Sequence, residues 1–314
     1  MSEYHIPVLL EESVSALVLN PSGVYADATF GGGGHSREIL SRLGPEGRLI
    51  AFDRDSEALA NRPDDCRLTL IHNNFRFIHN FLIELGYSEG IDGIIADLGV
   101  SSHQFDTPER GFSFRYDAGL DMRMDTGSGT TAADIINGRT MEELEKIFRM
   151  YGEVDNSGRI ARLICKARES SPVTTTSELE NAIAGALPPA ARHKALAKIY
   201  QALRIEVNGE MRSLEKFLQG AAASLRHGGR LAVITYHSLE DRMVKNFIRC
   251  GNVDGKDSRD LYGHATTPLT AVNRKPIVPE EEEIGRNTRA RSAKLRIAEK
   301  TGPDASGRPG REDE

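Results

Sequence analysis

The chain has 314 residues, a length that fits one large domain or two moderate ones. Hydrophobic residues make up 39% of it and charged residues 27%, which is ordinary for a globular protein and excludes a wholly disordered or fibrous chain. The formal net charge of −6 argues against a nucleic-acid-binding surface over the whole molecule, so any such surface must be a local patch.

The sequence contains no apolar run long enough to span a membrane, and no signal-peptide pattern opens it. We therefore expect a cytoplasmic protein with no membrane partner. The three cysteines, Cys66, Cys165 and Cys250, are scattered and lack metal-ligand spacing. We expect reduced thiols that serve as packing groups, and no metal site.

The first hundred residues alternate between predicted helices and strands. Residues 6–19 have helical spacing after Pro7. The strands are predicted at Val24–Ala28, Arg48–Phe52, Leu68–His72 and Ile91–Asp97. Between them lie the helical segments Ser36–Leu43, Ser56–Asn61 and Phe77–Leu85. This alternation predicts an α/β fold with a parallel sheet, whose ligands bind beyond the carboxyl ends of the strands.

A glycine-rich turn follows the first predicted strand and has the sequence Asp27-Ala-Thr-Phe-Gly31-Gly32-Gly33-Gly34-His35. Glycines at such a turn let the backbone pass where a Cβ would collide with a bound molecule. The second strand ends at Asp53, where an acid is placed to bind ribose hydroxyls. A glycine run alone is more often a linker, and a lone acid is more often solvated. Their order in one βαβ unit favours a nucleoside-bearing cofactor.

The glycine pattern does not fit a dinucleotide cofactor. In G-x-G-x-x-G, the third glycine would fall at Ser36 or, counted from Gly33, at Glu38. S-adenosylmethionine, which carries a nucleoside but no phosphate, fits better than a nicotinamide dinucleotide. The sequence therefore argues against an oxidoreductase that uses a nicotinamide dinucleotide.

The character of the sequence changes after Asp97 and returns near residue 203. Residues 132–202 are predicted to be helical, and basic residues outnumber acids between 156 and 204. This excess is typical of either a phosphate-contacting surface or a solvated helix face, and both interpretations stay open. We predict a Rossmann-like core formed by 1–106 and 203–300, an α-helical insert at 107–202 and a disordered tail at 301–314.

The second half of the predicted core repeats the α/β pattern. A helix is expected over Asn208–Leu225, ended by His227-Gly228-Gly229, before a buried strand at Arg230–Tyr236. Ser238 to Asp241 has the form of a capping box that starts a helix over Leu239–Arg249. Residues 250–286 are expected to form a loop, and Ser292–Glu299 a last strand.

Six separated motifs carry a resemblance to a known family. They are the Asp27–His35 turn, Asp97-Leu-Gly-Val-Ser-Ser102, Glu109-Arg-Gly-Phe-Ser-Phe114, Leu120-Asp-Met-Arg-Met-Asp125, His237-Ser-Leu-Glu-Asp-Arg242 and Asn287-Thr-Arg-Ala-Arg-Ser-Ala-Lys-Leu-Arg296. Together they resemble the MraW/RsmH family of bacterial 16S ribosomal RNA (cytosine-N4)-methyltransferases. The resemblance implies S-adenosylmethionine-dependent methylation of the exocyclic N4 of a cytidine in the decoding region of 16S ribosomal RNA.

The resemblance also implies a set of cofactor-binding residues. Gly33, Gly34 and His35 would belong to the glycine loop, and Asp53 would bind the ribose. Phe75 would pack near the adenine, while Asp97 and Gln104 would flank the far side of the cofactor. The chain departs from the family at Gly32, where Arg is common, and at Tyr236, where Phe is common.

The lone pair of N4 is delocalised into the ring, so N4 is a poor nucleophile. Because positive charge develops on N4 during methyl transfer, the enzyme needs a group that accepts its proton. Asp97 and His237 are the candidate catalytic residues, since each follows a predicted strand at the same sheet edge. Many amino-methyltransferases place two prolines and an aromatic residue after the catalytic acid. Here Leu98-Gly99-Val100 follows, so Asp97 is also a candidate for cofactor binding alone.

An RNA substrate requires stacking rings and cations. The candidate rings are Phe112, Phe114, Tyr116 and Tyr236. The candidate cations are Arg242 and the alternating Arg289, Arg291, Lys294 and Arg296, which on a strand would contact phosphate or protect an exposed edge. The expected partner is 16S ribosomal RNA in the small subunit. The sequence leaves open whether the substrate is naked RNA or an assembled particle, and whether the protein forms a homodimer.

Two other hypotheses stay open. One is a methyltransferase for a small molecule or a protein, with the insert closing over a pocket. The other is a cofactor-binding sensor or assembly factor without turnover. The salt dependence of RNA binding and the turnover of labelled methyl groups separate these hypotheses from the first.

Overall fold

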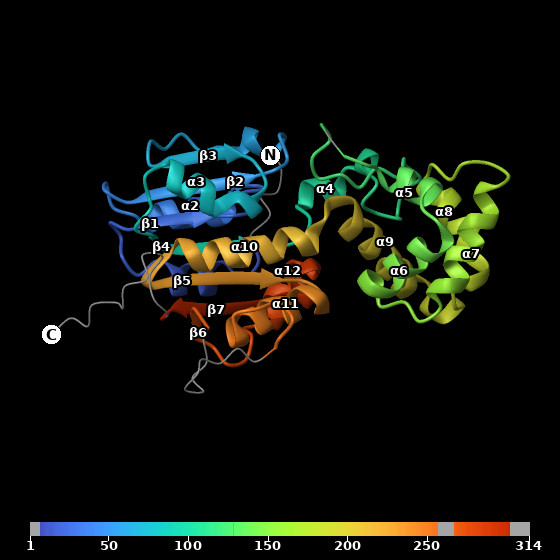
Figure 1. Cartoon of the computed structure of the whole chain (residues 1–314). Helices are drawn as coiled ribbons and strands as arrows, with labels where there is room; N and C mark the ends of the chain where they lie inside the picture. Colours follow the sequence, from blue (N-terminus) through green and yellow to red (C-terminus); the bar gives the residue numbers. More distant parts are fainter. Residues whose placement is uncertain (1–6, 128, 257–266, 302–314) are drawn as a thin grey trace. The chain divides into compact units, whose positions relative to one another are not determined.

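A computed structural model describes residues 7–127, 129–256 and 267–301. The chain divides into two compact units (Figure 1), here called unit 1 (Met1–Gly99 and Arg212–Glu314) and unit 2 (Val100–Met211). The insert expected at 107–202 lies within unit 2, which extends beyond it at both ends. All of the tail expected at 301–314, apart from Thr301, falls outside the described residues.

Unit 1 is built on one seven-stranded sheet with the order β3-β2-β1-β4-β5-β7-β6. Strands β1 to β5 are parallel, whereas β7 runs antiparallel to both β5 and β6. The strands are β1 (Val24–Asp27), β2 (Arg48–Asp53), β3 (Leu68–His72), β4 (Ile91–Asp97), β5 (Leu225–Thr235), β6 (Leu269–Ala271) and β7 (Lys294–Lys300). The α/β, Rossmann-like prediction is confirmed, and the strand order reverses between β1 and β4, where such sheets bind ligands.

The helices of unit 1 join and cover these strands. They are α1 (Leu10–Leu17), α2 (Gly34–Arg42), α3 (Ile78–Glu84), α10 (Glu210–Ser224, which crosses the unit boundary), α11 (Ser238–Cys250) and α12 (Glu281–Arg286), with 3₁₀ turns at Ala58–Asn61 (η1), Phe75–Phe77 (η2) and Thr288–Ser292 (η6). Four consecutive residues of β2, Leu49 to Phe52, are buried. Because alternate residues of a strand point to opposite faces, both faces of the sheet are covered there.

Two expectations about unit 1 were wrong. Helix α10 ends at Ser224, and β5 begins at Leu225, so His227, Gly228 and Gly229 lie within a strand and do not cap a helix. A register shift between β4 and β5 accommodates these residues. Residues 250–286 contain β6 and α12 in addition to loops. Strand β6 has only three residues, too few for an alternating pattern to reveal it.

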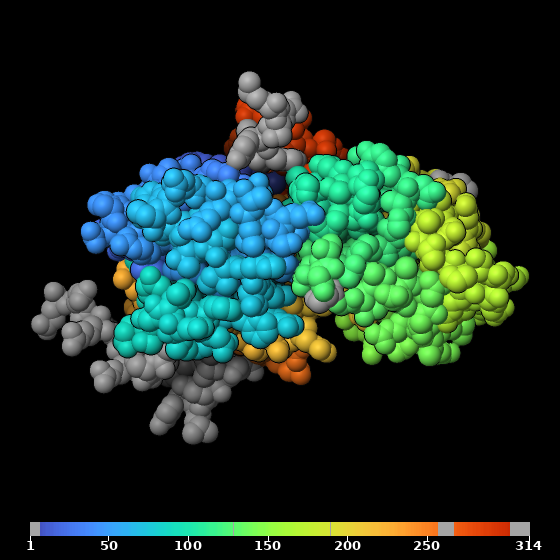
Figure 2. Space-filling view, turned by 90° about the horizontal axis from the view of Figure 1, so that it is seen from above, coloured from blue at the N-terminus to red at the C-terminus, as the bar shows by residue number. Residues whose placement is uncertain are grey.

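Unit 2 is helical. Its helices are α4 (Ser102–Asp106), α5 (Ala132–Gly138), α6 (Met141–Gly152), α7 (Ser157–Arg168), α8 (Thr176–Ile183) and α9 (Arg192–Asn208), with 3₁₀ turns at Pro108–Arg110 (η3), Ala184–Ala186 (η4) and Pro189–Ala191 (η5). Threonine capping boxes begin α5, α6 and α8, and each such cap contributes about 1 kcal/mol. Figure 2 shows these residues, coloured green to yellow, as one continuous block.

The core of unit 2 is a single apolar cluster. Leu144 and Phe148 of α6 are fully buried, as are Ile199 and Leu203 of α9. The cluster gives unit 2 an apolar core of its own. In the described segments of both units, we find no helix with the length and apolar character that crossing a membrane requires.

Candidate active site

Three aspartates end neighbouring parallel strands of unit 1. Asp27 of β1 pairs in register with Ala51 of β2 and with Ile95 of β4. Asp53 and Asp97 therefore lie two residues beyond Asp27, on either side of it. Since residues two apart on a strand share a face, the three carboxylates gather at one place on the carboxyl edge of the sheet. This edge is the predicted ligand site.

The glycine turn leads from β1 into α2, and its glycines serve different purposes. Gly31 and Gly33 have φ values of 51° and 75°, in the left-handed region that glycine enters at little cost. A Cβ on Gly34 would lie 2.1 Å from Cγ of Pro7, whereas one on Gly32 would meet nothing within 4 Å. Among the four glycines, Gly32 alone has nothing within 4 Å of an added Cβ. That the glycines make room for a ligand stays a prediction.

Asp53 connects the end of β2 to the glycine turn. Its Oδ2 accepts a 2.7 Å hydrogen bond from the backbone N–H of Gly31, and its Oδ1 accepts one of 2.8 Å from that of Asp55. Burial raises the pKa of this carboxyl, and the two N–H donors oppose that effect. Each carboxylate oxygen keeps a second lone pair, so Asp53 can still accept hydrogen bonds from ribose hydroxyls.

His35 lies in the first turn of α2 with its ring buried. Its Nε2 is 3.3 Å from the carbonyl oxygen of Val8, and its Nδ1 is 3.9 Å from Oδ2 of Asp97. Burial lowers the pKa of His35, although Asp97 opposes that effect. The His35 ring forms one wall beside the Asp97 carboxyl.

Asp97, the last residue of β4, is held through both its side chain and its backbone. The hydroxyl of Tyr236 donates a 2.7 Å hydrogen bond to its Oδ1, and its own backbone N–H donates to Oγ1 of Thr29 at 2.7 Å. Burial raises the pKa of Asp97 to about 6, against the lowering effects of His35 and Tyr236. A carboxylate with such a pKa is ionised at neutral pH, yet it is basic enough to take a proton from a reacting amine.

His237 caps the N-terminus of α11, a role that was predicted for Ser238. The predicted capping box began at Ser238, but the N-cap of α11 is His237. Its Nδ1 accepts from the backbone N–H of Glu240 at 3.4 Å, and Glu240 Oε2 accepts from the N–H of Tyr236 at 2.8 Å. His237 Nε2 lies 3.1 Å from Oε1 of Glu240. Its ring therefore faces Glu240, and a catalytic role for His237 stays a prediction.

Of the two remaining cofactor candidates, Phe75 lies in unit 1 with the sheet, whereas Gln104 lies in unit 2. Phe75 follows β3, whose last residue, His72, pairs with Asp53, and its half-buried ring meets that of Phe217 edge-on at 5.2 Å. Phe75 thus lies at the same edge as the aspartates. Gln104 belongs to unit 2, where its side chain completes the capping box of α4 with Ser101. Its predicted contact with a cofactor stays a prediction.

Sequence analysis missed two partners of Asp97. Tyr236 was a candidate stacking ring, but its hydroxyl is committed to Asp97. Thr29, inside the glycine-turn motif, was not singled out at all. The position of Tyr236 directly after a strand next to β4 was the available signal, because β4 and β5 end side by side.

The residues predicted to stack on RNA bases or to contact RNA phosphates differ in exposure and in their partners. Phe112 is buried in the core of unit 2, and Phe114 packs on Tyr200 with ring centroids 5.2 Å apart, whereas Tyr116 is exposed. Arg289 and Arg291 lie in a 3₁₀ turn, so the expectation of four cations alternating on a strand was wrong for these two. Lys294 and Arg296 are in β7, and both pair with Asp241.

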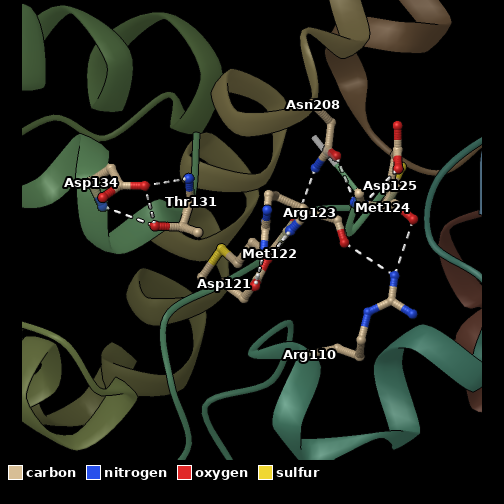
Figure 3. Close-up of polar contacts among 10 residues, drawn as sticks. Arg110, Asp121, Met122, Arg123, Met124, Asp125, Thr131, Asp134 and Asn208 are labelled. Carbon is tan, nitrogen blue, oxygen red and sulfur yellow. Dashed lines mark hydrogen bonds and ion pairs between the residues drawn. The ribbon is translucent and has the colours of Figure 1, made fainter. Parts of the chain in front are cut away.

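The motif Leu120–Asp125 forms a loop whose backbone groups are hydrogen-bonded by side chains from outside the motif (Figure 3). Asn208 accepts from the N–H of Met124 and donates to the carbonyl of Met122, both at 2.8 Å. Arg110 donates to the carbonyls of Arg123 and Met124, at 3.1 and 3.0 Å. Met122 is fully buried with φ 61°, a conformation that costs a non-glycine residue about 1–2 kcal/mol. These bonds stabilise an otherwise unfavourable turn.

Comparison with known proteins gives a consistent result. The profile of the MraW methylase family matches residues 2–301. A protein of Bacteroides fragilis named ribosomal RNA small subunit methyltransferase H is 55% identical over 297 residues, covering 95% of this chain and 97% of that protein. One of the same name from Flavobacterium johnsoniae is 54% identical over 298 residues, covering 95% and 98%. Among solved structures, a putative rRNA methylase of Clostridium thermocellum aligns with a TM-score of 0.41 at 15% identity, covering 94% of this chain and 99% of that one.

Proposed function

The chain belongs to the MraW methylase family, and we propose that it transfers a methyl group from S-adenosylmethionine to the exocyclic N4 of one cytidine in the decoding region of 16S ribosomal RNA. The observation that supports this reaction best is the Asp97 carboxyl at the edge of the sheet, with its pKa raised to about 6 and its Oδ1 bonded to Tyr236. An N4 methyl transfer needs such an acceptor.

The residues at the edge fit S-adenosylmethionine. Its sulfonium and amino groups are cationic, and Asp27, Asp53 and Asp97 supply carboxylates at the site. We assign the ribose to Asp53 and the adenine to the neighbourhood of Phe75. Gly33, Gly34 and His35 shape the turn beneath the cofactor, and Asp97 flanks its methionine end. The role of Gln104 in cofactor binding stays a prediction.

The chain's own part in the reaction is to position N4 and to receive its proton. The bound donor supplies an electrophilic methyl carbon. As the lone pair of N4 forms the new N–C bond and the S–C bond breaks, positive charge develops on N4. Asp97 stabilises that charge and accepts one N4 proton, leaving the neutral methylated amine. His237 is the alternative acceptor.

We assign RNA binding to unit 2. One face of α7 is buried through Ile160 and Ile164, and its other face exposes Arg159, Arg162 and Lys166. Such a basic face suits the phosphates of a folded RNA. The proposed substrate is the RNA within the small ribosomal subunit, in the cytoplasm. A homodimer is compatible with this activity, and light scattering of the purified protein tests it.

The test uses purified protein, S-adenosylmethionine with a labelled methyl group, and small subunits or 16S RNA from a strain that lacks this enzyme. We expect label in RNA, and N4-methylcytidine after digestion to nucleosides. Binding of RNA should weaken steeply as salt rises. Label in protein or in a small molecule, with none in RNA, would replace this proposal by the alternative methyltransferase hypothesis. Binding of the donor without turnover would favour a sensor.

A further inference from the structure

A pocket lies in unit 1 between α11 and the two antiparallel strands β6 and β7, which run side by side in Figure 1. Its volume is about 400 Å³, within the range of small-ligand sites. Ile248, Leu269 and Ala271 provide apolar surface. Lys245, Arg249 and Arg274 surround that surface with positive charge, and none of the described residues that line the pocket is acidic.

The charges around this pocket are available to a ligand. Lys245, Arg249 and Arg274 are all exposed, and among the residues with described positions Lys245 and Arg274 form no ion pair. Arg296, also in the lining, is mostly buried, and its Nε donates to Asp241 at 2.7 Å. The charge of Arg296 is therefore balanced by Asp241. The excess positive charge comes from Lys245, Arg249 and Arg274, which form the rim of the pocket. Exposed cations around an apolar floor are suited to an anion that also carries an apolar group.

We infer that this pocket binds one nucleotide of the RNA substrate other than the methylated cytidine, with its base against Ile248, Leu269 and Ala271 and its phosphate between Lys245 and Arg274. A nucleotide combines a flat base, which packs on apolar surface, with a phosphate, which pairs with Lys and Arg. The inference rests on the proposed activity toward ribosomal RNA.

The position of the pocket along α11 agrees with this assignment. Helix α11 begins at the candidate site, with His237 as its N-cap, and Lys245 lies eight residues further on. At 1.5 Å per residue this places Lys245 ~12 Å along the helix from His237. An RNA strand that delivers a cytidine to the Asp97 edge can therefore reach the pocket with a nearby nucleotide.

The experiment compares RNA binding by the full-length protein and two double variants. Lys245→Gln with Arg274→Gln removes the rim charge, and Lys216→Gln with Arg48→Gln removes two exposed cations elsewhere in unit 1 as a matched control. We expect the pocket variant alone to lower the slope of log K against log salt, by about 0.7 for each lost phosphate contact. Its KM for small subunits should rise several-fold while kcat is retained.

A third variant tests entry of the base. Ala271→Trp keeps every charge but fills the pocket, since Ala271 is exposed and lines it. We expect KM to rise while the salt slope stays unchanged. An unchanged KM in this variant would overturn the base-binding pocket. An unchanged salt slope in the charge variant would overturn the phosphate contact.

These outcomes are separate from those that test the methyltransferase activity. RNA that binds without being methylated would overturn the proposed reaction, while the salt slopes would still decide the pocket. Failure of the unaltered protein to bind small subunits or 16S RNA at low salt would overturn both.

Discussion

The hydroxyl of Tyr236 donates a 2.7 Å hydrogen bond to Oδ1 of Asp97, joining residues at the ends of two neighbouring parallel strands. Burial of Asp97 raises its pKa to about 6, and this bond opposes that effect because it stabilises the ionised carboxylate. Burial and Asp97 together raise the pKa of Tyr236 well above its usual range. Tyr236 is therefore a permanent donor, and it adjusts the basicity of the proposed proton acceptor.

The first prediction concerns the pH dependence of methyl transfer. In the proposed reaction Asp97 acts as the carboxylate, so we expect kcat/KM to fall as the pH drops through about 6. In Tyr236→Phe the stabilising donor is lost, and the pKa of Asp97 rises. The acid limb of the profile should then move to higher pH, while kcat above pH 8 changes little. A limb that stays in place would show that Tyr236 does not act on the titrating group.

The second prediction concerns Asp53 and the cofactor. Asp53→Asn keeps one oxygen to accept from a backbone N–H, so the glycine turn should fold. The loss of charge-assisted bonds to ribose hydroxyls, about 1.5–3 kcal/mol, should weaken binding of S-adenosylhomocysteine by about 10- to 100-fold. Calorimetry measures the affinity, with Asp55→Asn as the control. Equal affinity in the wild type and the Asp53 variant would remove Asp53 from the site.

The glycine turn provides a matched pair of substitutions. In Gly34→Ala the new Cβ would overlap Pro7, which predicts a loss of about 1–3 kcal/mol of stability. In Gly32→Ala the Cβ would point into open space, so stability should be unchanged. Thermal unfolding without ligand measures both. Equal melting temperatures for the two variants would mean that the contact between Gly34 and Pro7 does not constrain the turn.

The loop Leu120–Asp125 should depend on Asn208. In Asn208→Ala, two backbone groups of the loop lose their partner, and each buried unsatisfied group costs about 1–3 kcal/mol. Asn208→Asp keeps the acceptor for the N–H of Met124 but not the donor for the carbonyl of Met122, so its loss should be intermediate. Denaturant unfolding followed by a probe in unit 2 gives the order of the three proteins. An alanine variant as stable as the wild type would refute the role of Asn208.

The sequence predicted the sheet and its ligand-binding edge because strong local patterns specify them. The apolar runs ending at Asp27, Asp53 and Asp97 required only periodicity and the order of elements. The hydrogen bond between Tyr236 and Asp97 spans 139 residues, and it depends on the register of β4 and β5, which no local pattern reveals. The one-residue error at the start of α11 has a different cause. Both His237 and Ser238 can cap a helix, and the hydrogen bond from the N–H of His237 to Glu240, which completes a capping box, decides between them.

Mapping of methylated cytidines in 16S ribosomal RNA decides whether this protein carries out the proposed reaction. RNA would be isolated from cells that lack this protein and from the same cells supplied with the wild type or with Asp97→Asn. Mass spectrometry should find an N4-methyl group at one cytidine of the decoding region with the wild type, and almost none in the other two samples. The same methylation in cells without the protein, or a methyl group on another nucleoside when the wild type is supplied, would contradict the account.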